Sequence, residues 1–419
     1  MSKITGEIIT QAIASRSYKQ PASSQKDARD LQISVDGMSF GLTTGNNTGG
    51  VSQNLYFDAD ASKVLLSFLK DLLKESKKFD QEIDTPIQSI FFGAPGTGKS
   101  FKIDDPEKGY GLKDVDESCK FRTTFHPDYD YAQFVGAYKP KKEGEKITYS
   151  FVPQVFAKAY AAAWKLYLEA KGDSRDSIGA SPLQNDSGKD IQVYLVIEEI
   201  NRGNCAQIFG DIFQLLDRIS DGLDKGFSQY SIDADCDFAT WLKENSVLKT
   251  VWSDYETKVG DGKLRLPPNL NILATMNTSD QSLFPMDSAF KRRFDWEYVP
   301  ISFEGKDAAN YQIDIDGSQY SWQNFVEAVN DKILDLTESE DKQLGEFFIK
   351  PDSGNVISKE RFLGKVMFYL WNEVCKDEHK NGSFFRAKIN DKEDFFTFQD
   401  LYKKKDLLKL FMDELLKKE

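Results

Sequence analysis

Residues that build metal or disulfide sites are scarce in this 419-residue sequence, which has two histidines and four cysteines. The cysteines stand far apart and form no CxxC pair, so we expect no zinc site. They are Cys119, Cys205, Cys236 and Cys375. This usage is typical of a chain kept in a reducing compartment, and we expect a cytoplasmic location.

Long apolar runs and a surplus of positive charge are also missing. The sequence has no run of about 18 apolar residues, and its start, MSKITGE, lacks the apolar core of a signal peptide. We therefore expect no membrane association. The net charge is −13, which repels nucleic acid, so any DNA contact requires a local basic patch or a partner.

What the sequence does contain is a glycine-rich loop, FFGAPGTGKS at residues 91–100. An apolar strand leads into it, and its glycines let the backbone turn so that N–H groups face an anion. A helix is expected to follow, with Lys99 reaching the β- and γ-phosphates and the Ser100 hydroxyl suited to Mg²⁺. The pattern predicts a nucleoside triphosphate site. Its expected nucleotide-binding residues are Gly93, Pro95, Gly96, Thr97, Gly98, Lys99 and Ser100.

A second motif, VYLVIEEINRGN at residues 193–204, is an apolar run that ends in Glu198 and Glu199. A buried parallel strand presents its ligand-binding residues at its carboxyl end. We expect Glu198 to help hold Mg²⁺ and Glu199 to orient or deprotonate the attacking water. The alternative is a solvated helix start, where glutamate is favoured. The phosphate-binding loop upstream favours the functional interpretation.

A third motif spans residues 270–301, where another apolar strand ends in the polar residues MNTSD. From a neighbouring strand end, the amide of Asn277 can hydrogen-bond the γ-phosphate or the attacking water. The segment DSAFKRRF, residues 287–294, then predicts a helix that carries Arg292 and Arg293. A basic triplet is often a solvated face. Its place shortly after a γ-phosphate sensor favours an arginine finger directed at a neighbouring subunit.

Patterning along the chain predicts three parts: a region of uncertain fold at 1–60, an α/β domain at 61–300 and a helical domain at 301–419. In the first part, LQISVDGMSFGL alternates and predicts a strand pair. Residues 61–79 predict an amphipathic helix. Short apolar strands then alternate with helices, the pattern of a parallel sheet. Helical periodicity follows at residues 322–336, 361–376 and 406–418.

The motifs GAPGTGKS, IEEINRGN, MNTSD and FKRRF together resemble an AAA+ module, and in particular the McrB family. This family comprises the motor GTPases of McrBC-type, modification-dependent restriction systems. MNTSD resembles the family signature MNTAD, and TTFHPDYDYAQFVGAYKP at residues 123–140 resembles the stretch before its acidic strand. The resemblance covers residues 86–300 well, the helical remainder loosely and the first 60 residues not at all. It implies an α/β AAA+ P-loop NTPase domain with a parallel sheet and a C-terminal helical lid.

The resemblance also implies roles for individual residues. Glu199 corresponds to the catalytic acid, Asn277 to the sensor and Asp280 to the acid of the signature. Arg292 or Arg293 corresponds to the arginine at the subunit interface.

Two departures from the family pattern bear on these roles. Glu198 stands where many AAA+ proteins have aspartate, which leaves its part in metal binding open. Gln281 replaces the arginine that often follows the signature acid, so the function of that arginine is missing or is supplied elsewhere.

The expected activity is nucleotide hydrolysis by a ring, expected to be hexameric, that drives DNA translocation and cleavage through an McrC-like nuclease partner. The sequence has no NKxD guanine signature, so the choice of GTP depends on the resemblance alone and ATP stays the alternative. A different class is also open: a MoxR- or dynein-like ATPase that remodels proteins without a nuclease. Residues 1–60 have five basic against six acidic residues, which is no electrostatic footprint for DNA. Target recognition is therefore expected in a partner or another interface.

Overall fold

The computed structural model describes residues 30–36, 39–45, 86–106, 109–143, 146–172, 191–222, 224–244, 247–279, 284, 286–376, 384–389 and 392–417. Near the N-terminus, β1 (Asp30–Asp36) and β2 (Ser39–Gly45) pair antiparallel, with Asp36 opposite Ser39. The strand pair predicted there is confirmed. The helix predicted at residues 61–79 lies outside the described residues.

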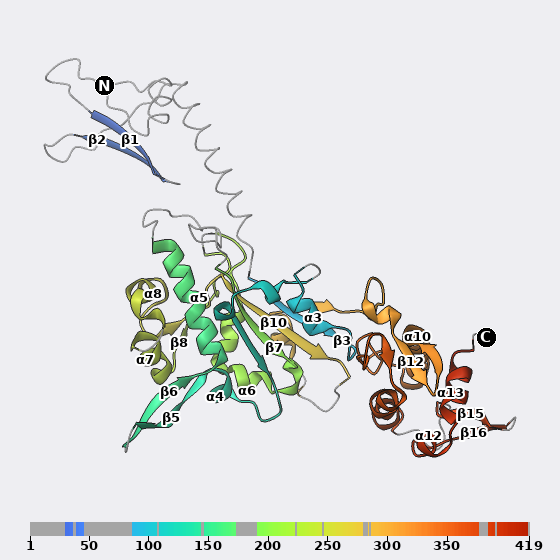
Figure 1. Ribbon diagram of the computed structural model, residues 1–419. Helices are drawn as coiled ribbons and strands as arrows, with labels where there is room; N and C mark the ends of the chain where they lie inside the picture. Colours follow the sequence, from blue (N-terminus) through green and yellow to red (C-terminus); the bar gives the residue numbers. More distant parts are fainter. Residues whose placement is uncertain are drawn as a thin grey trace, which may run out of the picture.

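The largest sheet has five strands in the spatial order β11-β3-β10-β7-β4, and all of its pairings are parallel (Figure 1). Its strands are β3 (Gln88–Gly93), β4 (Lys120–Thr124), β7 (Val193–Glu198), β10 (Leu270–Asn277) and β11 (Asp295–Tyr298). The three central strands are almost continuously buried, as expected for strands that are covered on both faces. The predicted parallel α/β sheet is confirmed.

The register of this sheet brings the ends of its strands together. Asn277, at the end of β10, pairs with Gly93 at the end of β3. Glu198, at the end of β7, pairs with Thr124 at the end of β4. The polar residues that follow the strands therefore meet at one edge of the sheet.

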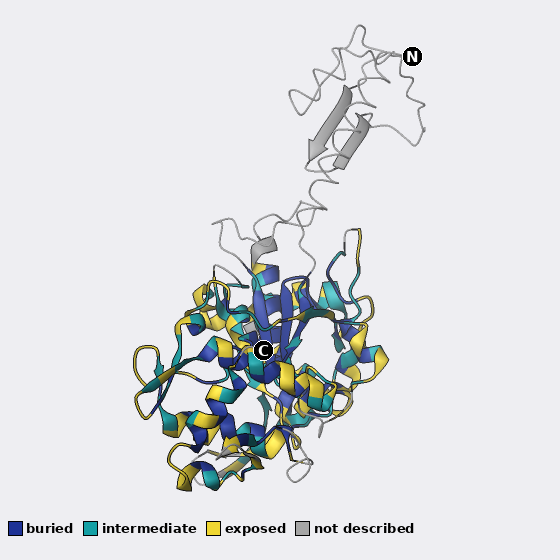
Figure 2. Ribbon diagram, turned by 90° about the vertical axis from the view of Figure 1, so that its right-hand side faces the viewer, coloured by how far each residue is buried: buried dark blue, intermediate teal, exposed yellow. Residues whose placement is uncertain are grey.

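Apolar side chains from both faces of the sheet form the interior. In Figure 2 the ribbon of buried residues, including those of the sheet, is dark blue. One face packs against α5 (Val155–Gly172) and α6 (Cys205–Phe209), and the other against α3 (Lys99–Asp104). The smaller elements are α4 (Tyr131–Phe134), β5 (Gly136–Glu143), β6 (Lys146–Pro153), β8 (Ile232–Asp233), α7 (Cys236–Glu244), α8 (Trp252–Val259), β9 (Lys263–Leu264) and α9 (Ser288–Lys291). No helix within the described ranges has the length and apolarity needed to cross a bilayer.

The C-terminal part is helical at the three predicted places. Its helices are α10 (Trp322–Thr337), α11 (Lys359–Arg361), α12 (Asp400–Lys403) and α13 (Leu407–Leu415), with π-helical turns at Phe362–Met367 and Leu370–Val374. It also has strands, which the helical prediction did not include. They are β12 (Gln312–Ile315), β13 (Ser318–Ser321), β14 (Val356–Ile357), β15 (Arg386–Ile389) and β16 (Lys392–Phe395). None is longer than four residues, so even the alternating sequence QIDI of β12 is too short to be recognised as a strand between helical segments.

The C-terminal elements enclose a core of their own. Its buried residues begin at Phe303 and include Trp322, Phe325 and Phe411. They form a cluster separate from those that line the five-stranded sheet. Figure 1 shows the C-terminal elements, in orange and red, beside the carboxyl end of the sheet.

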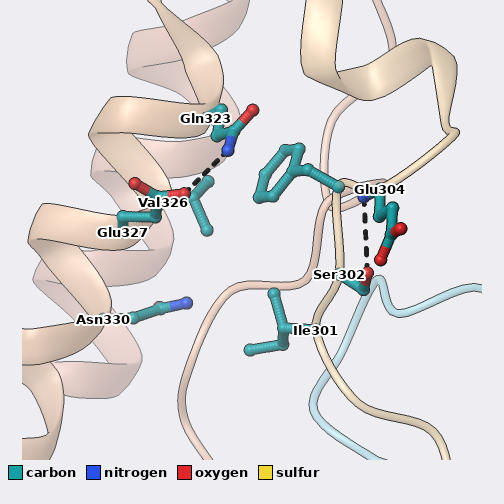
Figure 3. A pocket seen from close by; sticks show the side chains of 8 residues that line it. Ile301, Ser302, Glu304, Gln323, Val326, Glu327 and Asn330 are labelled. Atoms are coloured by element: carbon teal, nitrogen blue, oxygen red, sulfur yellow. Dashed lines mark hydrogen bonds between the residues drawn. The ribbon is translucent and has the colours of Figure 1, made fainter.

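A cavity of about 410 Å³ lies where the chain passes from the sheet into the C-terminal elements (Figure 3). Residues 301–304 line one side of it, and α10 lines the other with Gln323, Val326, Glu327 and Asn330. The Asn330 amide is engaged by the backbone of Leu344, accepting from its N–H at 2.8 Å and donating to its carbonyl at 2.9 Å. This side chain therefore fixes the position of the segment that begins at Leu344.

Candidate functional site

The predicted phosphate loop connects β3 to α3, and its glycines adopt the conformations that the prediction required. The φ angles of Gly93, Gly96 and Gly98 are 151°, 85° and 82°. At Gly96 a side chain is also excluded by space, because a Cβ atom would lie 2.5 Å from the backbone nitrogen of Phe348. Thr97 is buried and its hydroxyl donates to a carbonyl of the same loop at 3.2 Å. The turn and the helix that starts at Lys99 agree with the sequence prediction.

Lys99 lies inside this loop and is only 7% exposed. Its ammonium group donates to the carbonyl oxygens of Gly93 at 3.0 Å and Ala94 at 2.8 Å. Burial lowers the pKa of Lys99 to about 8, although the carboxylates of Glu199 and Glu198 favour its charged form. The loop thus holds a cation in place where a triphosphate is expected.

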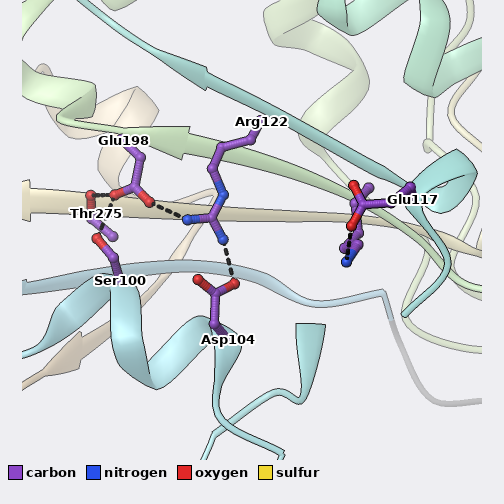
Figure 4. Close-up of polar contacts among 7 residues, drawn as sticks. Ser100, Asp104, Glu117, Arg122, Glu198 and Thr275 are labelled. Carbon is purple, nitrogen blue, oxygen red and sulfur yellow. Dashed lines mark hydrogen bonds and ion pairs between the residues drawn. The ribbon is translucent and has the colours of Figure 1, made fainter. Parts of the chain in front are cut away.

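Glu198 joins the phosphate loop to the sheet. Its Oε2 atom accepts a hydrogen bond from Ser100 Oγ at 2.9 Å and another from the hydroxyl of Thr275 (Figure 4). Hydroxyl and carboxylate oxygens are the ligand types that Mg²⁺ prefers. The pairing of Ser100 with Glu198 therefore fits a magnesium ion, and the extra methylene of glutamate does not prevent this contact.

Glu199 is directed to a different partner. It follows β7 in the left-handed conformation, with φ 55° and ψ 48°, which is uncommon outside glycine. Its Oε1 accepts from the amide of Asn277 at 2.5 Å, and its backbone N–H donates to Thr275 Oγ1 at 3.2 Å. The backbone turn after Glu198 thus separates the two acids, one beside Ser100 and one beside the predicted sensor.

The two arginines of the third motif differ in their surroundings. Arg293 is engaged within the chain: its guanidinium pairs with Asp217 at 2.6 Å and lies 4.0 Å from the centroid of the Phe213 ring. Arg292 is exposed and lines a cavity of about 570 Å³ together with Arg293 and Tyr230. The helix is shorter than predicted, because α9 ends at Lys291. Asp280 and Gln281 lie outside the described residues.

Arg122 is a residue of this site that the sequence analysis missed. It lies on β4 and donates to Glu198 Oε1 at 3.0 Å, while its other terminal nitrogen pairs with Asp104 on α3 (Figure 4). A possible signal was the placement of an arginine inside KFRTT, a strand next to the acidic one. No spacing rule links that position to Glu198.

A segment of the C-terminal part also reaches the phosphate loop. The backbone N–H of Gly345 donates to the carbonyl of Pro95 at 2.9 Å, and that of Phe347 donates to Gly96 at 2.8 Å. These contacts attach the C-terminal elements directly to the predicted nucleotide site. No sequence pattern indicated these contacts.

Glu346 lies between these two contacting residues and is fully buried. Its carboxylate pairs with Lys306, and its backbone carbonyl accepts from the Trp322 indole at 2.9 Å. Burial raises the pKa of Glu346, and the contact with Lys306 opposes this effect. The ion pair thus anchors the contacting segment to the start of the C-terminal part.

Comparisons with known proteins agree with this geometry. The family model of the AAA domain (dynein-related subfamily) matches residues 88–294. The chain is 31% identical over 355 residues to the type II restriction enzyme BsuMI component YdiS of Bacillus subtilis (strain 168), covering 77% of this chain and 91% of that protein. It is 23% identical over 261 residues to the type IV methyl-directed restriction enzyme EcoKMcrB subunit of Escherichia coli (strain K12). That alignment covers 61% of this chain and 43% of the relative.

Proposed function

Because this chain belongs to the McrB family of AAA+ proteins from restriction systems, we propose that it is the nucleotide-driven motor of such a system. As an AAA+ protein it is a nucleoside triphosphatase. We favour GTP as the substrate, with ATP as the alternative. The observation that carries the proposal is the joining of three sequence motifs through two contacts, Ser100 with Glu198 and Asn277 with Glu199.

In the proposed chemistry, Lys99 and the loop N–H groups from Gly93 to Ser100 bind the phosphates. Ser100 and Glu198 hold Mg²⁺, which, when bound, neutralises charge on the triphosphate. Glu199 orients or deprotonates the attacking water, and Asn277 fixes the Glu199 carboxylate while contacting the γ-phosphate. Asp280 is assigned to the site by the family signature alone.

The proposed assembly is a ring, hexameric by family resemblance, with nucleotide between subunits. Within it we assign the trans arginine to Arg292, because Arg293 already pairs with Asp217 inside its own chain. Arg293 then serves as the anchor that holds the end of α9. The exposed guanidinium of Arg292 is available to a neighbouring subunit.

We propose three domains: residues 1–60, the AAA+ α/β domain at 61–300 and the lid at 301–419. The separate apolar clusters that meet around residue 300 support the second boundary. The first boundary rests on sequence patterning.

The proposed partner is an McrC-like nuclease that acts on foreign or modified DNA, and the proposed location is the cytoplasm. The names of both relatives, a BsuMI component and an McrB subunit, support a restriction role. The net charge of −13 supports DNA contact through the assembly more than through this chain alone.

A MoxR- or dynein-like protein-remodelling ATPase is the second candidate, since the matching AAA domain is of the dynein-related subfamily.

Hydrolysis of GTP and ATP, measured side by side with and without the co-encoded nuclease subunit, tests the proposal. We expect GTP to be preferred and the nuclease subunit to increase its turnover. A preference for ATP that no nuclease subunit alters would favour the protein-remodelling candidate. Binding without turnover of either nucleotide would contradict both.

A subunit-mixing experiment tests the assignment of Arg292. Arg292→Ala should bind nucleotide but hydrolyse it poorly, and Lys99→Ala should fail to bind it. In a mixture, the Lys99→Ala subunit can offer its intact arginine to the site of its neighbour, so hydrolysis should partly recover as protein concentration rises. Lys291→Ala, which removes an adjacent exposed charge, is the matched control and should be active alone. If only Arg293→Ala is complemented, the two arginines are assigned in the wrong order; if neither is, the shared site is wrong.

A further inference from the structure

We propose that Arg122 is a positioning residue that competes with Mg²⁺ for the Glu198 carboxylate and thereby sets the metal concentration at which nucleotide binds tightly. The inference depends on the nucleotide site proposed above and adds to it a residue that no motif assigns. Arg122 holds Glu198 while the metal is absent. When the metal binds, the guanidinium withdraws from Glu198 and stays attached to Asp104.

The geometry places Arg122 between two carboxylates. On β4 it stands opposite Val196, two residues before the point where Thr124 pairs with Glu198. The side chains of Arg122 and Glu198 therefore lie on the same face of the sheet. One terminal nitrogen donates to Glu198 Oε1 at 3.0 Å, and the other pairs with Asp104. Figure 4 shows this fork between β7 and α3.

Both oxygens of the Glu198 carboxylate accept hydrogen bonds in this arrangement. Its Oε2 receives the hydroxyls of Ser100 and Thr275, and its Oε1 receives Arg122. A magnesium ion beside Ser100 Oγ needs oxygen from the same carboxylate. Two cations on one carboxylate repel each other, so metal binding must weaken the contact with Arg122.

Arg122 can move away from Glu198 and still have both a carboxylate partner and access to water. Its side chain is 40% exposed, and that of Asp104 is 39% exposed, whereas that of Glu198 is only 14% exposed. The terminal nitrogen that leaves Glu198 thus moves toward water, while the other terminal nitrogen keeps its contact with Asp104. A lysine has a single ammonium group and does not span both acids with a planar fork.

Glu199 is not part of this contact, because its carboxylate is held by Asn277. The proposed competition therefore acts on the metal ligand and leaves the candidate for water activation in place. This separation makes metal dependence, rather than turnover, the property to measure.

The test is equilibrium binding of mant-labelled GMPPNP and AMPPNP to the full chain, first in EDTA and then at increasing Mg²⁺. The readout is the Mg²⁺ concentration at which half of the gain in affinity is reached. Arg122→Gln removes the competing charge and should lower this midpoint about three- to tenfold. Asp104→Asn leaves Arg122 with Glu198 as its one carboxylate partner among the residues that the structure describes, and it should raise the midpoint.

Arg361→Gln is the matched control. Arg361 pairs with Asp352 at 2.9 Å on the C-terminal part, and the two side chains are 42% and 39% exposed, nearly the values for Arg122 and Asp104. Its loss should leave the midpoint unchanged. Arg122→Lys, which keeps the charge, should fall between wild type and Arg122→Gln.

Two results would overturn the inference. A midpoint that Arg122→Gln leaves unchanged or raises means that the arginine does not compete with the metal. A shift of the same sign in Arg122→Gln and Asp104→Asn means that the ion pair only supports the local fold. If Arg122→Gln does not fold, the direction of the Asp104→Asn shift decides. Absence of any mant-nucleotide binding by the wild type would instead contradict the proposed function.

Discussion

Lys99→Met should stabilise the nucleotide-free protein near neutral pH while it abolishes nucleotide binding. Lys99 is buried in the phosphate loop, and this burial lowers its pKa from an ordinary value of 10.5 to about 8. The proton is thus bound more weakly in the folded chain than in the unfolded chain. At every pH below about 8, the buried charge therefore costs stability in full, and the cost disappears as pH rises through 10.5.

The size of this cost follows from the change in pKa. One pKa unit corresponds to about 1.4 kcal/mol, so the charged Lys99 costs about 3 kcal/mol of unfolding free energy at pH 7. Methionine has a similar length and no charge, but it leaves two backbone carbonyls without the ammonium donor. Each lost hydrogen bond costs about 1 kcal/mol. We expect the variant to be more stable than wild type by about 1 kcal/mol at pH 7, and less stable by about 1–2 kcal/mol at pH 10.

Urea unfolding followed by tryptophan fluorescence, at pH 7 and pH 10 without nucleotide, measures this change in the sign of the stability difference. Lys165→Met, a change at a partly exposed lysine of α5, is the control and should show no reversal. A Lys99→Met variant that is less stable than wild type by the same amount at both pH values would refute the reasoning. In that case burial does not penalise the charge, and the hydrogen bonds to the loop dominate.

Three substitutions probe the rest of the site. Glu199→Gln removes the charge and keeps the shape, so turnover should fall about 10²–10⁴-fold while nucleotide binding persists. Phosphate release measures the turnover, and equilibrium binding of nucleotide is measured beside it. Unchanged turnover would exclude Glu199 as the catalytic acid. Asn277→Ala should lower turnover more than affinity in the same pair of assays, and an equal loss of both would contradict the sensor role. Gly96→Ala should lower the unfolding free energy by about 1–3 kcal/mol more than Gly317→Ala. The two glycines have φ angles of 85° and 83°, but a Cβ atom at Gly96 would meet the backbone of Phe348 whereas one at Gly317 would meet nothing within 4 Å. If thermal unfolding shows the same loss of stability in both variants, the backbone at Phe348 makes room for the added methyl group without a cost in free energy.

The part of the site that sequence predicts is the part that lies at strand ends. The carboxyl ends of parallel strands lie at the same edge of a sheet, so an apolar run that leads into Glu199 and another that ends in Asn277 imply that these two side chains lie close together. The phosphate loop is predictable for a related reason, because its glycines are required by backbone conformation within a few residues. Local rules decide these features.

The parts that were missed depend on contacts between distant residues. The choice between Arg292 and Arg293 depends on Asp217, which is far away in sequence and belongs to no motif. Arg122 was not singled out for the same reason, since its partners come from β7 and α3. The short strands β12 to β16 have at most four residues each, so pairing with neighbouring strands decides their structure more than their own sequence does.

The hydrogen bonds from Gly345 and Phe347 to the phosphate loop have a mechanical consequence. They join the loop that is expected to contact the nucleotide to a part of the chain that has its own apolar core. Any displacement of the loop on nucleotide binding or hydrolysis would therefore be passed directly to that core. We expect this direct connection to couple the state of the nucleotide to the position of the C-terminal elements.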